Sequence, residues 1–396
     1  MNNLFYICNA LDDTTRLERG IVTDSPAASR KIFMICQALR TAGVRATVIS
    51  LGRGRQDGSG RYFHAKSVRI NGIRVVYLPF LHRPILSELL SLVAFIPLMF
   101  RLSSSRGAKA ALFYNRLPVY AFGIALARVL GFGTVLDLED GETTLAASSV
   151  AGIRSRALRW YFDAMCNKGA LLACSALDAF TSLRPVQCCY GTSEPKQLQR
   201  ECNPSLISVL LGGTVSHETG AQLLIDAIRL LRAEQPAFAG KIQFDISGKG
   251  DCIEQFEALG ATQARPAVVV HGRLTDDEYS ALLRRTTVGL ALKPNVGGLA
   301  YTTFPSKVIE FSSNGILVVS TDISDVRKVL QGAALYLSSE DPRELIEQLR
   351  WIVENPDEAG QLALRGAQAA ESTCSPKLVG QSLAGFFFPA PAGRSR

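Results

Sequence analysis

Short apolar runs and amphipathic segments alternate along the whole chain. The apolar runs predict buried strands, and segments with apolar residues at helical spacing predict helices between them. The predicted strands cover 3–8, 46–51, 67–70, 74–78, 110–114, 134–138, 170–173, 207–211, 242–247, 267–270, 288–293, 316–320 and 334–336. The predicted helices cover 27–41, 119–130, 155–166, 221–234, 253–259, 276–285, 305–313, 324–330, 342–354 and 357–370. Asn71-Gly72 predicts a tight hairpin turn between two of these strands, and the remaining alternation predicts parallel sheets.

A polar segment between about Gly191 and Pro204, rich in turn-forming residues, interrupts this alternation. A chain of 396 residues is also too long for one ordinary core. The sequence therefore predicts an α/β fold with two Rossmann-like domains, whose parallel sheets face a cleft. The N-terminal domain is predicted at 1–200 and the second at 201–374, and a tail at 375–396 is a candidate for packing back on the first domain. Ligands of parallel sheets bind beyond the carboxyl ends of the strands, so the cleft is the expected site.

Composition narrows the class of protein. Hydrophobic residues make up 47% and charged residues 20%, which is typical of globular proteins. The net charge of +8 favours anionic partners such as nucleotides or phospholipid surfaces. Nucleic acid is not expected as a partner, because the basic residues are scattered and no recognised nucleic-acid-binding motif occurs. The nine cysteines include no C-x-x-C pair and the N-terminus resembles a strand rather than a signal peptide, which predicts reduced thiols in a cytoplasmic protein.

The apolar stretch 85–100 raises the question of a membrane. Polar residues interrupt it, and it is shorter than the roughly 20 residues of a spanning helix, so a transmembrane segment is not expected. Arg83 precedes the stretch, and Arg101 and Arg106 follow it. Two interpretations stay open: a helix packed in or on the first domain, or an interfacial patch that makes peripheral contact with an anionic bilayer.

The segment 303–311 contains the strongest candidate for ligand binding. Pro305 suits the first turn of a helix, and no preceding side chain can cap that helix, so the backbone N–H groups of its first turn are predicted to lack local acceptors. A phosphate would supply one, with help from the hydroxyl of Ser306 and the ammonium of Lys307. Glu310, one turn further on, can accept two hydrogen bonds from a ribose diol. The alternative is an ordinary helix with Lys307 and Glu310 solvated.

Several other positions at predicted strand ends are candidates for contact with the same ligand. Gly-x-Gly after the strand 242–247 allows backbone to approach a ligand closely, although an ordinary tight turn is an equal alternative. Arg273 follows the next strand, where it can meet a base or a phosphate, or simply lie on the surface. The predicted contacts are Gly213, Thr214, Gly248, Lys249, Gly250, Arg273 and Thr303.

Four acidic residues gather at the end of the strand 134–138: Asp137, Glu139, Asp140 and Glu142. Such a cluster can bind sugar hydroxyls, act as a base or hold a divalent metal, or it can be a solvated loop. The four histidines show no metal-ligand spacing, so no metal site is predicted. Asn115-Arg116 ends the preceding strand and is expected to reach the same place.

Taken together, these residues resemble the retaining GT-B glycosyltransferases of the group 1 or family 4 type, in their Pro-Ser-Lys subtype. The pattern Pro-Ser-Lys-x-x-Glu-x-x-x-x-Gly-x-x-Val-Val is present as Pro305, Ser306, Lys307, Glu310, Gly315, Val318 and Val319. The resemblance extends over almost the whole chain and is strongest from 211 to 370. It implies that the second domain binds a UDP- or GDP-linked sugar and the first domain the acceptor. It also places Glu310 on the ribose, and Ser306 and Lys307 near the diphosphate.

The resemblance implies retaining catalysis without a metal or other cofactor, and we take Lys307, Glu139 and Asp140 as the candidate catalytic residues. Threonines stand where the family often has charged residues: Thr214 and Thr219 in place of an Arg and a Lys, and Thr302 in place of a Glu. The positive charges of Lys249, Arg273 and Lys307 can compensate.

The leading hypothesis is a glycosyltransferase acting on a saccharide or polyprenyl-linked acceptor in surface polysaccharide or exopolysaccharide synthesis. It would be cytoplasmic, with peripheral contact at the inner face of the cytoplasmic membrane through 85–100. Two alternatives stay open. One is a catalytically degenerate binding or scaffold protein, and the other is a nucleotide-sugar epimerase of the same fold.

Overall fold

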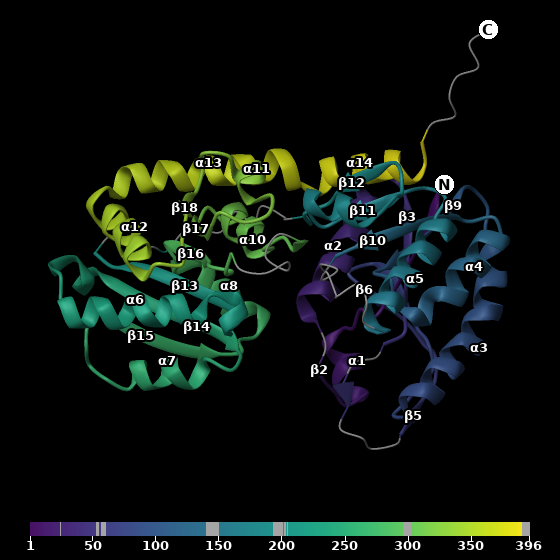
Figure 1. Ribbon diagram of the computed structural model, residues 1–396, viewed down its shortest axis with the longest axis horizontal. Coiled ribbons are helices and arrows are strands. Elements are labelled where there is room, and N and C mark those ends of the chain that lie inside the picture. Colours follow the sequence, from purple (N-terminus) through teal and green to yellow (C-terminus); the bar gives the residue numbers. More distant parts are fainter. Residues whose placement is uncertain are drawn as a thin grey trace, which may run out of the picture. The chain divides into compact units, whose positions relative to one another are not determined.

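The computed structural model describes residues 1–23, 25–52, 55–56, 61–139, 150–192, 201, 203, 205–295 and 302–389. The chain forms two units, shown in Figure 1. Unit 1 comprises Met1–Thr192 together with Pro376–Arg396, and unit 2 comprises Ser193–Ser375. The chain passes from unit 1 to unit 2 after Thr192 and returns to unit 1 after Ser375.

Unit 1 is built on an eight-stranded sheet with the order β12-β11-β10-β9-β1-β3-β7-β6. Its strands are β1 (Asn3–Cys8), β3 (Arg45–Ser50), β6 (Lys66–Ile70), β7 (Ile73–Tyr77), β9 (Lys109–Tyr114), β10 (Gly133–Leu138), β11 (Ala170–Leu172) and β12 (Val186–Cys188). All neighbouring pairs are parallel except β6 and β7. The carboxyl ends of β1, β9 and β10 therefore lie at one edge of the sheet, where ligands of such sheets bind.

The antiparallel pair confirms the predicted hairpin. Ile70 pairs with Ile73, and the two turn residues between them, Asn71 and Gly72, have φ values of 49° and 78°. A two-residue turn with both φ values positive is the type that Asn-Gly favours, because Gly has no Cβ and Asn tolerates this region. The turn is thus determined by two neighbouring residues.

Helices cover both faces of the sheet of unit 1. They are α1 (Asp13–Glu18), α2 (Pro26–Thr41), α3 (Pro84–Ser103), α4 (Ala121–Val129), α5 (Val150–Met165) and α14 (Pro376–Phe387). Two small antiparallel pairs lie outside the main sheet: β2 (Ile21–Thr23) with β4 (Arg55–Gln56), and β5 (Tyr62–Phe63) with β8 (Phe80–Leu81). The chain moves from β1 through α2 to β3 in one direction, and through α3, α4 and α5 in the opposite direction. Right-handed crossovers therefore place α2 on one face and α3, α4 and α5 on the other.

The C-terminal helix α14, which was not among the predicted helices, packs against α2 (Figure 1). Leu383 and Phe387 of α14 are buried in the core of unit 1. The two helices approach so closely that a Cβ on Gly380 would lie 2.0 Å from the carbonyl oxygen of Ala38. The helix α14 is therefore an integral layer of unit 1.

The apolar helix α3 is longer than the predicted stretch 85–100. It has 20 residues, and its part Ile85–Ser103 has a mean hydropathy of 1.9 with 22% of it buried. Within the described part of the chain, this is the one helix whose length and composition would allow it to cross a membrane. The expectation that this stretch is too short to span a membrane is therefore wrong in its premise, because the helix has 20 residues.

Unit 2 has a six-stranded parallel sheet with the order β15-β14-β13-β16-β17-β18. Its strands are β13 (Ile207–Thr214), β14 (Ile242–Lys249), β15 (Ala267–Gly272), β16 (Val288–Ala291), β17 (Leu317–Thr321) and β18 (Leu335–Leu337). Its helices are α6 (Ala221–Glu234), α7 (Ile253–Gly260), α8 (Asp276–Arg285), α10 (Lys307–Ser313), α11 (Val326–Leu330), α12 (Pro342–Glu354) and α13 (Pro356–Cys374). The crossovers through α8 and α10 run in the same direction along the sheet, so right-handedness places both helices on the same face.

Candidate functional site

The turn before α10 differs from its prediction. The helix begins at Lys307 rather than at Pro305, and the N–H of Val308 donates to the carbonyl oxygen of Pro305 at 3.0 Å. One N–H group that was predicted to lack a local acceptor therefore has one. The side chain of Ser306, at the N-cap position, makes no capping hydrogen bond. The helix start alone is thus a weaker anion site than predicted, so anion binding here would depend more on the surrounding side chains.

Those side chains converge on one point. The ammonium of Lys307 forms an ion pair with the carboxylate of Glu310 and donates a hydrogen bond to the hydroxyl of Tyr279 at 2.9 Å. The hydroxyl of Tyr279 donates in turn to Oε2 of Glu310 at 3.2 Å. The side chains of Lys307 and Glu310 are 26% and 23% exposed, so the cluster is accessible from solvent. The structure therefore joins the two residues predicted for diphosphate and ribose, and excludes the alternative in which both are simply solvated.

Tyr279 was not among the predicted site residues. It lies one turn into α8, whose start is closed by a capping box between Thr275 and Glu278. The ammonium of Lys307 also lies 4.7 Å from the centroid of the Tyr279 ring, within the range of a cation–π interaction. A single aromatic residue on an amphipathic helix gives no sequence signal of such a role, since most are core residues.

Two glycines at the end of β13 make room for this cluster. A Cβ on Gly212 would lie 3.0 Å from the Tyr279 hydroxyl, and a Cβ on Gly213 would lie 3.4 Å from Cε of Lys307. Side chains at these positions would crowd the tyrosine and the lysine. The cluster therefore adjoins the carboxyl end of β13, and contact of Gly213 and Thr214 with a ligand stays a prediction.

The glycines of the Gly-x-Gly motif have a different environment. The strand β14 continues to Lys249, so Gly248 pairs with Gly213 and Lys249 pairs with Thr214. A Cβ on Gly248, whose φ is 137°, would lie 1.7 Å from the carbonyl oxygen of Gly213. A Cβ on Gly250 would similarly lie 2.0 Å from the carbonyl oxygen of Val215. Close approach of β13 to β14 explains both glycines, and their contact with a ligand stays a prediction.

We expect Gly248→Ala to lower the free energy of unfolding of unit 2 by at least about 2 kcal/mol, because it combines a positive φ with a backbone clash. Denaturant unfolding followed by the fluorescence of Trp351, which lies in α12, would measure the change. Gly240→Ala is the matched control, since a Cβ at Gly240 would have no neighbour within 4 Å. Equal stability of the two variants would contradict the packing explanation.

A second lysine lies in the same region of unit 2. The ammonium of Lys293, just after β16, donates to the hydroxyl of Thr303, which precedes α10. The hydroxyl of Thr321 donates to the carbonyl oxygen of Lys293 at 2.6 Å, which ties this loop to the end of β17. Lys293 was not among the candidates, because nothing in its local sequence distinguishes it from a surface lysine. Lys293 therefore adds a cation at the carboxyl ends of β16 and β17, the strands that precede and follow α10.

The threonines at the positions where charged residues were expected have structural contacts. The hydroxyl of Thr219 donates to the carbonyl oxygen of Thr214 at 2.7 Å and accepts from the N–H of Ser216 at 3.0 Å. These bonds close the loop between β13 and α6. Lys249 and Arg273 are exposed at the ends of β14 and β15, and β15 is the edge strand of the sheet. Arg273 is therefore two strands away from the glycines of β13.

The acidic residues of unit 1 are not a solvated loop in the part that the structure describes. Glu139 forms an ion pair with Lys31 of α2 at 2.5 Å, and the two side chains are only 12% and 14% exposed. Burial by itself would lower the pKa of Lys31, but the nearby charges, Glu139 first, outweigh it and raise that pKa. Glu139 is thus held by a cation, whereas Asp140 and Glu142 lie outside the described residues.

A buried acid lies beside this pair. Asp137, which is 1% exposed, accepts a hydrogen bond from the hydroxyl of Tyr6. Burial, and then the charge of Asp137, hold the pKa of Tyr6 well above its usual range, so the phenol stays protonated and donates. Asn115 accepts a hydrogen bond from the N–H of Glu139 at 2.9 Å. These groups form a polar cluster at the carboxyl ends of β1, β9 and β10.

Arg116 does not join that cluster as expected. It is buried and donates to Asp163 of α5 and to the carbonyl oxygen of Phe180, both at 2.9 Å. Asp163 also accepts from the hydroxyl of Thr181 and from the N–H of Ser182. Arg116 thus ties β9 to two other segments, and only its neighbour Asn115 reaches the predicted place.

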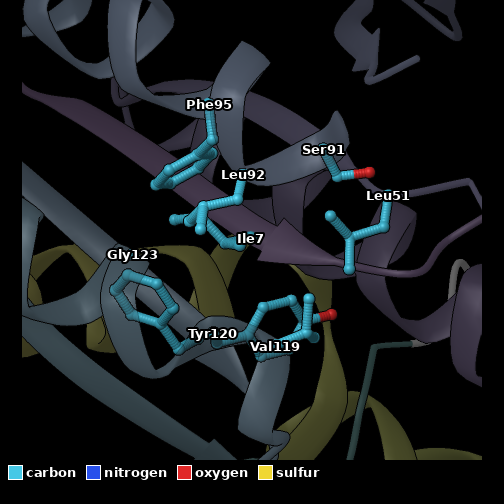
Figure 2. Close-up of a pocket in the computed structure, with 9 residues that line it drawn as sticks. Ile7, Leu51, Ser91, Leu92, Phe95, Val119, Tyr120 and Gly123 are labelled. Carbon is cyan, nitrogen blue, oxygen red and sulfur yellow. The ribbon is translucent and has the colours of Figure 1, made fainter. Parts of the chain in front are cut away.

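An apolar pocket lies in unit 1, at the ends of β1 and β9 and beneath α3 and α4 (Figure 2). Its cavity volume is only about 20 Å³, close to the space that one water molecule needs. It is lined by Ile7, Leu51, Ser91, Leu92, Phe95, Phe113, Val119, Tyr120 and Gly123. Figure 2 shows Phe95 and Leu92 of α3 directed toward Tyr120 and Val119 across the pocket. The lining is apolar apart from Ser91 and Tyr120.

Comparison with known proteins agrees with this arrangement. Residues 207–355 match the family model described as glycosyl transferases group 1. Over almost its whole length the chain is similar to solved structures, among them Anabaena HepE in complex with UDP, which is 13% identical with a TM-score of 0.64, covering 97% of this chain and 98% of the other. Sucrose-phosphate synthase from Thermosynechococcus elongatus is 13% identical with a TM-score of 0.67, again covering 97% of this chain and 98% of the other. The α,α-trehalose-phosphate synthase (UDP-forming) from Burkholderia xenovorans, in complex with glucose-6-phosphate, is 12% identical with a TM-score of 0.69, covering 97% of this chain and 99% of the other. No curated protein sequence matches the chain. The predicted α/β fold with two Rossmann-like domains, the GT-B architecture, is confirmed.

Proposed function

We propose that this chain, whose residues 207–355 match the model of the group 1 glycosyl transferases, is a retaining enzyme that moves a sugar from a nucleotide sugar to a saccharide or lipid-linked acceptor. The observation that carries the proposal is the cluster of Lys307, Glu310 and Tyr279 beside the glycines that end β13. It combines a cation, a carboxylate and a phenol in an accessible position at the carboxyl edge of a parallel sheet. That edge is where such sheets bind nucleotides.

The donor would separate the ion pair that the free protein contains. The two hydroxyls of a ribose diol would each donate a hydrogen bond to the carboxylate of Glu310, and the diphosphate would accept hydrogen bonds from the ammonium of Lys307 and from the hydroxyl of Ser306. Binding would thus exchange one ion pair for several charge-assisted hydrogen bonds. Support for UDP as the nucleotide comes from the similar structures of HepE, which holds UDP, and trehalose-phosphate synthase, which is named UDP-forming. GDP is the second candidate.

The chemical step would need positive charge on the diphosphate as it leaves. In a retaining transfer with front-face attack, the bond from the sugar's anomeric carbon to the diphosphate oxygen breaks while the acceptor oxygen bonds to the same face. The leaving diphosphate takes the proton of the acceptor hydroxyl. Donors aimed at the developing charge stabilise that transition state. Lys307 would supply this charge, helped by Lys293 near the same strand ends, so we expect no metal requirement.

Unit 1 would hold the acceptor. The ion-paired Glu139, the buried Asp137 and Asn115 lie at the carboxyl edge of its sheet, and carboxylates are suitable acceptors for sugar hydroxyls. A polyprenyl-linked saccharide is the candidate among lipid-linked acceptors. Such an acceptor fits a cytoplasmic enzyme of surface polysaccharide synthesis.

A panel of UDP-, GDP- and dTDP-sugars with saccharide and polyprenyl-linked acceptors tests the proposal. We expect one donor to give turnover, and proton NMR of the product to show the anomeric configuration of the donor. Inversion would contradict the retaining mechanism. The threonines at 214, 219 and 302 favour a second candidate, a binding protein without catalysis. Nucleotide-sugar binding without turnover on any acceptor would favour that candidate.

A further inference from the structure

Much of the apolar surface of the helix α3 faces solvent. Its buried positions recur once per turn: the first two are the serines Ser87 and Ser91, and the next two are the apolar residues Phe95 and Met99. In contrast, Ile85 and Val93 are 78% and 66% exposed. An amphipathic helix on a sheet normally shows the reverse arrangement, with apolar residues inward. Packing within unit 1 therefore does not account for the exposed apolar residues of this helix.

The apolar positions of α3 also form a continuous stripe. Leu86, Val93 and Phe100, all exposed, are spaced by seven residues, which returns to the same side of a helix after two turns. Leu89 is exposed one turn before Val93, and Ile85 one turn before Leu89. The stripe therefore extends along most of the helix.

The next two helices repeat the arrangement. Phe122 and Val129 on α4 are exposed and seven residues apart, and so are Ile153 and Trp160 on α5. The helix α4 lies beside α3 on one side and α5 on the other, and the hydroxyl of Tyr161 in α5 donates to the carbonyl oxygen of Ala121 in α4. All three helices cover the same face of the sheet. Their exposed apolar residues therefore form one surface directed away from the sheet, which we call the outer face of α3–α5.

The charge of these helices is strongly asymmetric. Arg101, Arg128, Arg154 and Arg156 are all exposed. Within the described residues of α3, α4 and α5, the acidic side chains are Glu88 and Asp163, and Asp163 is engaged by Arg116. An apolar surface surrounded by arginines complements a layer whose interior is apolar and whose headgroups are anionic.

We propose that the outer face of α3–α5 docks on the surface of an anionic phospholipid bilayer. The helices lie in the plane of the interface, with the stripe on α3 in the acyl boundary and the arginines at the phosphates. Trp160, which is 74% exposed, suits the headgroup level, where indole rings are enriched. A second copy of this chain is a poorer partner, because it would oppose the same positive charges. The docking goes beyond the proposed function and does not rest on it.

Co-sedimentation with vesicles tests the docking. The wild-type protein is expected to bind vesicles of phosphatidylcholine with phosphatidylglycerol, and to bind less to pure phosphatidylcholine and at high salt. The triple variant Ile85→Ser, Leu89→Ser, Val93→Ser should bind at least about tenfold more weakly, because it removes three exposed apolar side chains from the stripe. Leu364→Ser, the same kind of substitution at an exposed leucine of α13 in unit 2, is the control and should bind like the wild type.

The fluorescence of Trp160 gives an independent readout. The chain has two tryptophans, so Trp351→Phe leaves Trp160 as the only reporter. Anionic vesicles should shift its emission to the blue, and brominated lipids should quench it. Equal binding of the triple variant and the wild type, or an unchanged Trp160 spectrum with vesicles, would overturn the proposal. So would a wild-type dimer that the triple variant abolishes, if neither protein binds vesicles.

Discussion

Replacing Glu310 by alanine is expected to weaken the binding of the nucleotide sugar by about tenfold to a hundredfold, the usual effect of losing hydrogen bonds to a charged group. In the free protein Glu310 is bound by Lys307 and Tyr279, so its carboxylate is already held in place for two donors. A ribose diol would replace these partners without any change of helix position. Isothermal titration with UDP and GDP would measure the affinity, and Glu347→Ala, at an exposed glutamate of α12, is the matched control.

A deoxygenated nucleotide makes this experiment specific for the ribose. The wild-type protein should bind a 2′,3′-dideoxy nucleotide about as weakly as Glu310→Ala binds the normal one. The variant itself should no longer distinguish the two nucleotides, because the group that recognises the diol is absent. If removal of the hydroxyls costs the same affinity in both proteins, Glu310 does not hold the ribose. Tyr279→Phe completes the set, since it removes a hydroxyl that bonds to both charged residues.

Replacing Lys31 by methionine is expected to lower the free energy of unfolding of unit 1 by about 3–5 kcal/mol, because it leaves the carboxylate of Glu139 buried without its cation. The double variant Lys31→Met, Glu139→Gln should recover most of that loss, since it removes both charges. Urea unfolding followed by Trp160, in a Trp351→Phe background, would report on unit 1. A double variant as unstable as the single one would contradict the assignment of the loss to an unpaired charge.

A lysine in an exposed ion pair of the same unit provides the control. Lys66 pairs with Glu18, but their side chains are 26% and 48% exposed, so Lys66→Met should cost less than about 1 kcal/mol. The pH dependence follows from the direction of the shift. The pKa of Lys31 is raised above its ordinary 10.5 in the folded state, so its contribution is complete below pH 10.5 and declines only as the pH rises through the folded-state value. The single variant should therefore show its full loss at neutral pH.

Elements with purely local causes could be predicted closely. The helix α8 begins and ends where the sequence indicated, because Thr275 and Glu278 cap its start and arginines complete its last turn. The hairpin at Asn71-Gly72 is equally local. The helix α14 was not predicted, because its stability depends on α2, which is more than 300 residues away in the chain.

The candidate site shows the same division. The Pro-Ser-Lys-x-x-Glu pattern identified Lys307 and Glu310, and their spacing of one helical turn makes their contact a local matter. Tyr279 and Lys293 come from other crossovers of the sheet, and their neighbouring residues carry no mark of the role. They could be found only when the parallel sheet brought the ends of its strands together.

The sequence by itself determined the α/β class, the hairpin, the motif residues of unit 2 and most of the order of strands and helices, but not β12, α1 or α14. It also showed that α3 is apolar, since composition is a property of the segment alone. Only the tertiary structure decided that the apolar side of α3 faces solvent and that Glu139 pairs with Lys31, 108 positions earlier in the chain. The physical reason is that the direction of a side chain depends on what packs beneath its helix, and the state of a charge depends on groups that folding alone brings near. Those are contacts between distant segments, and no local pattern records them.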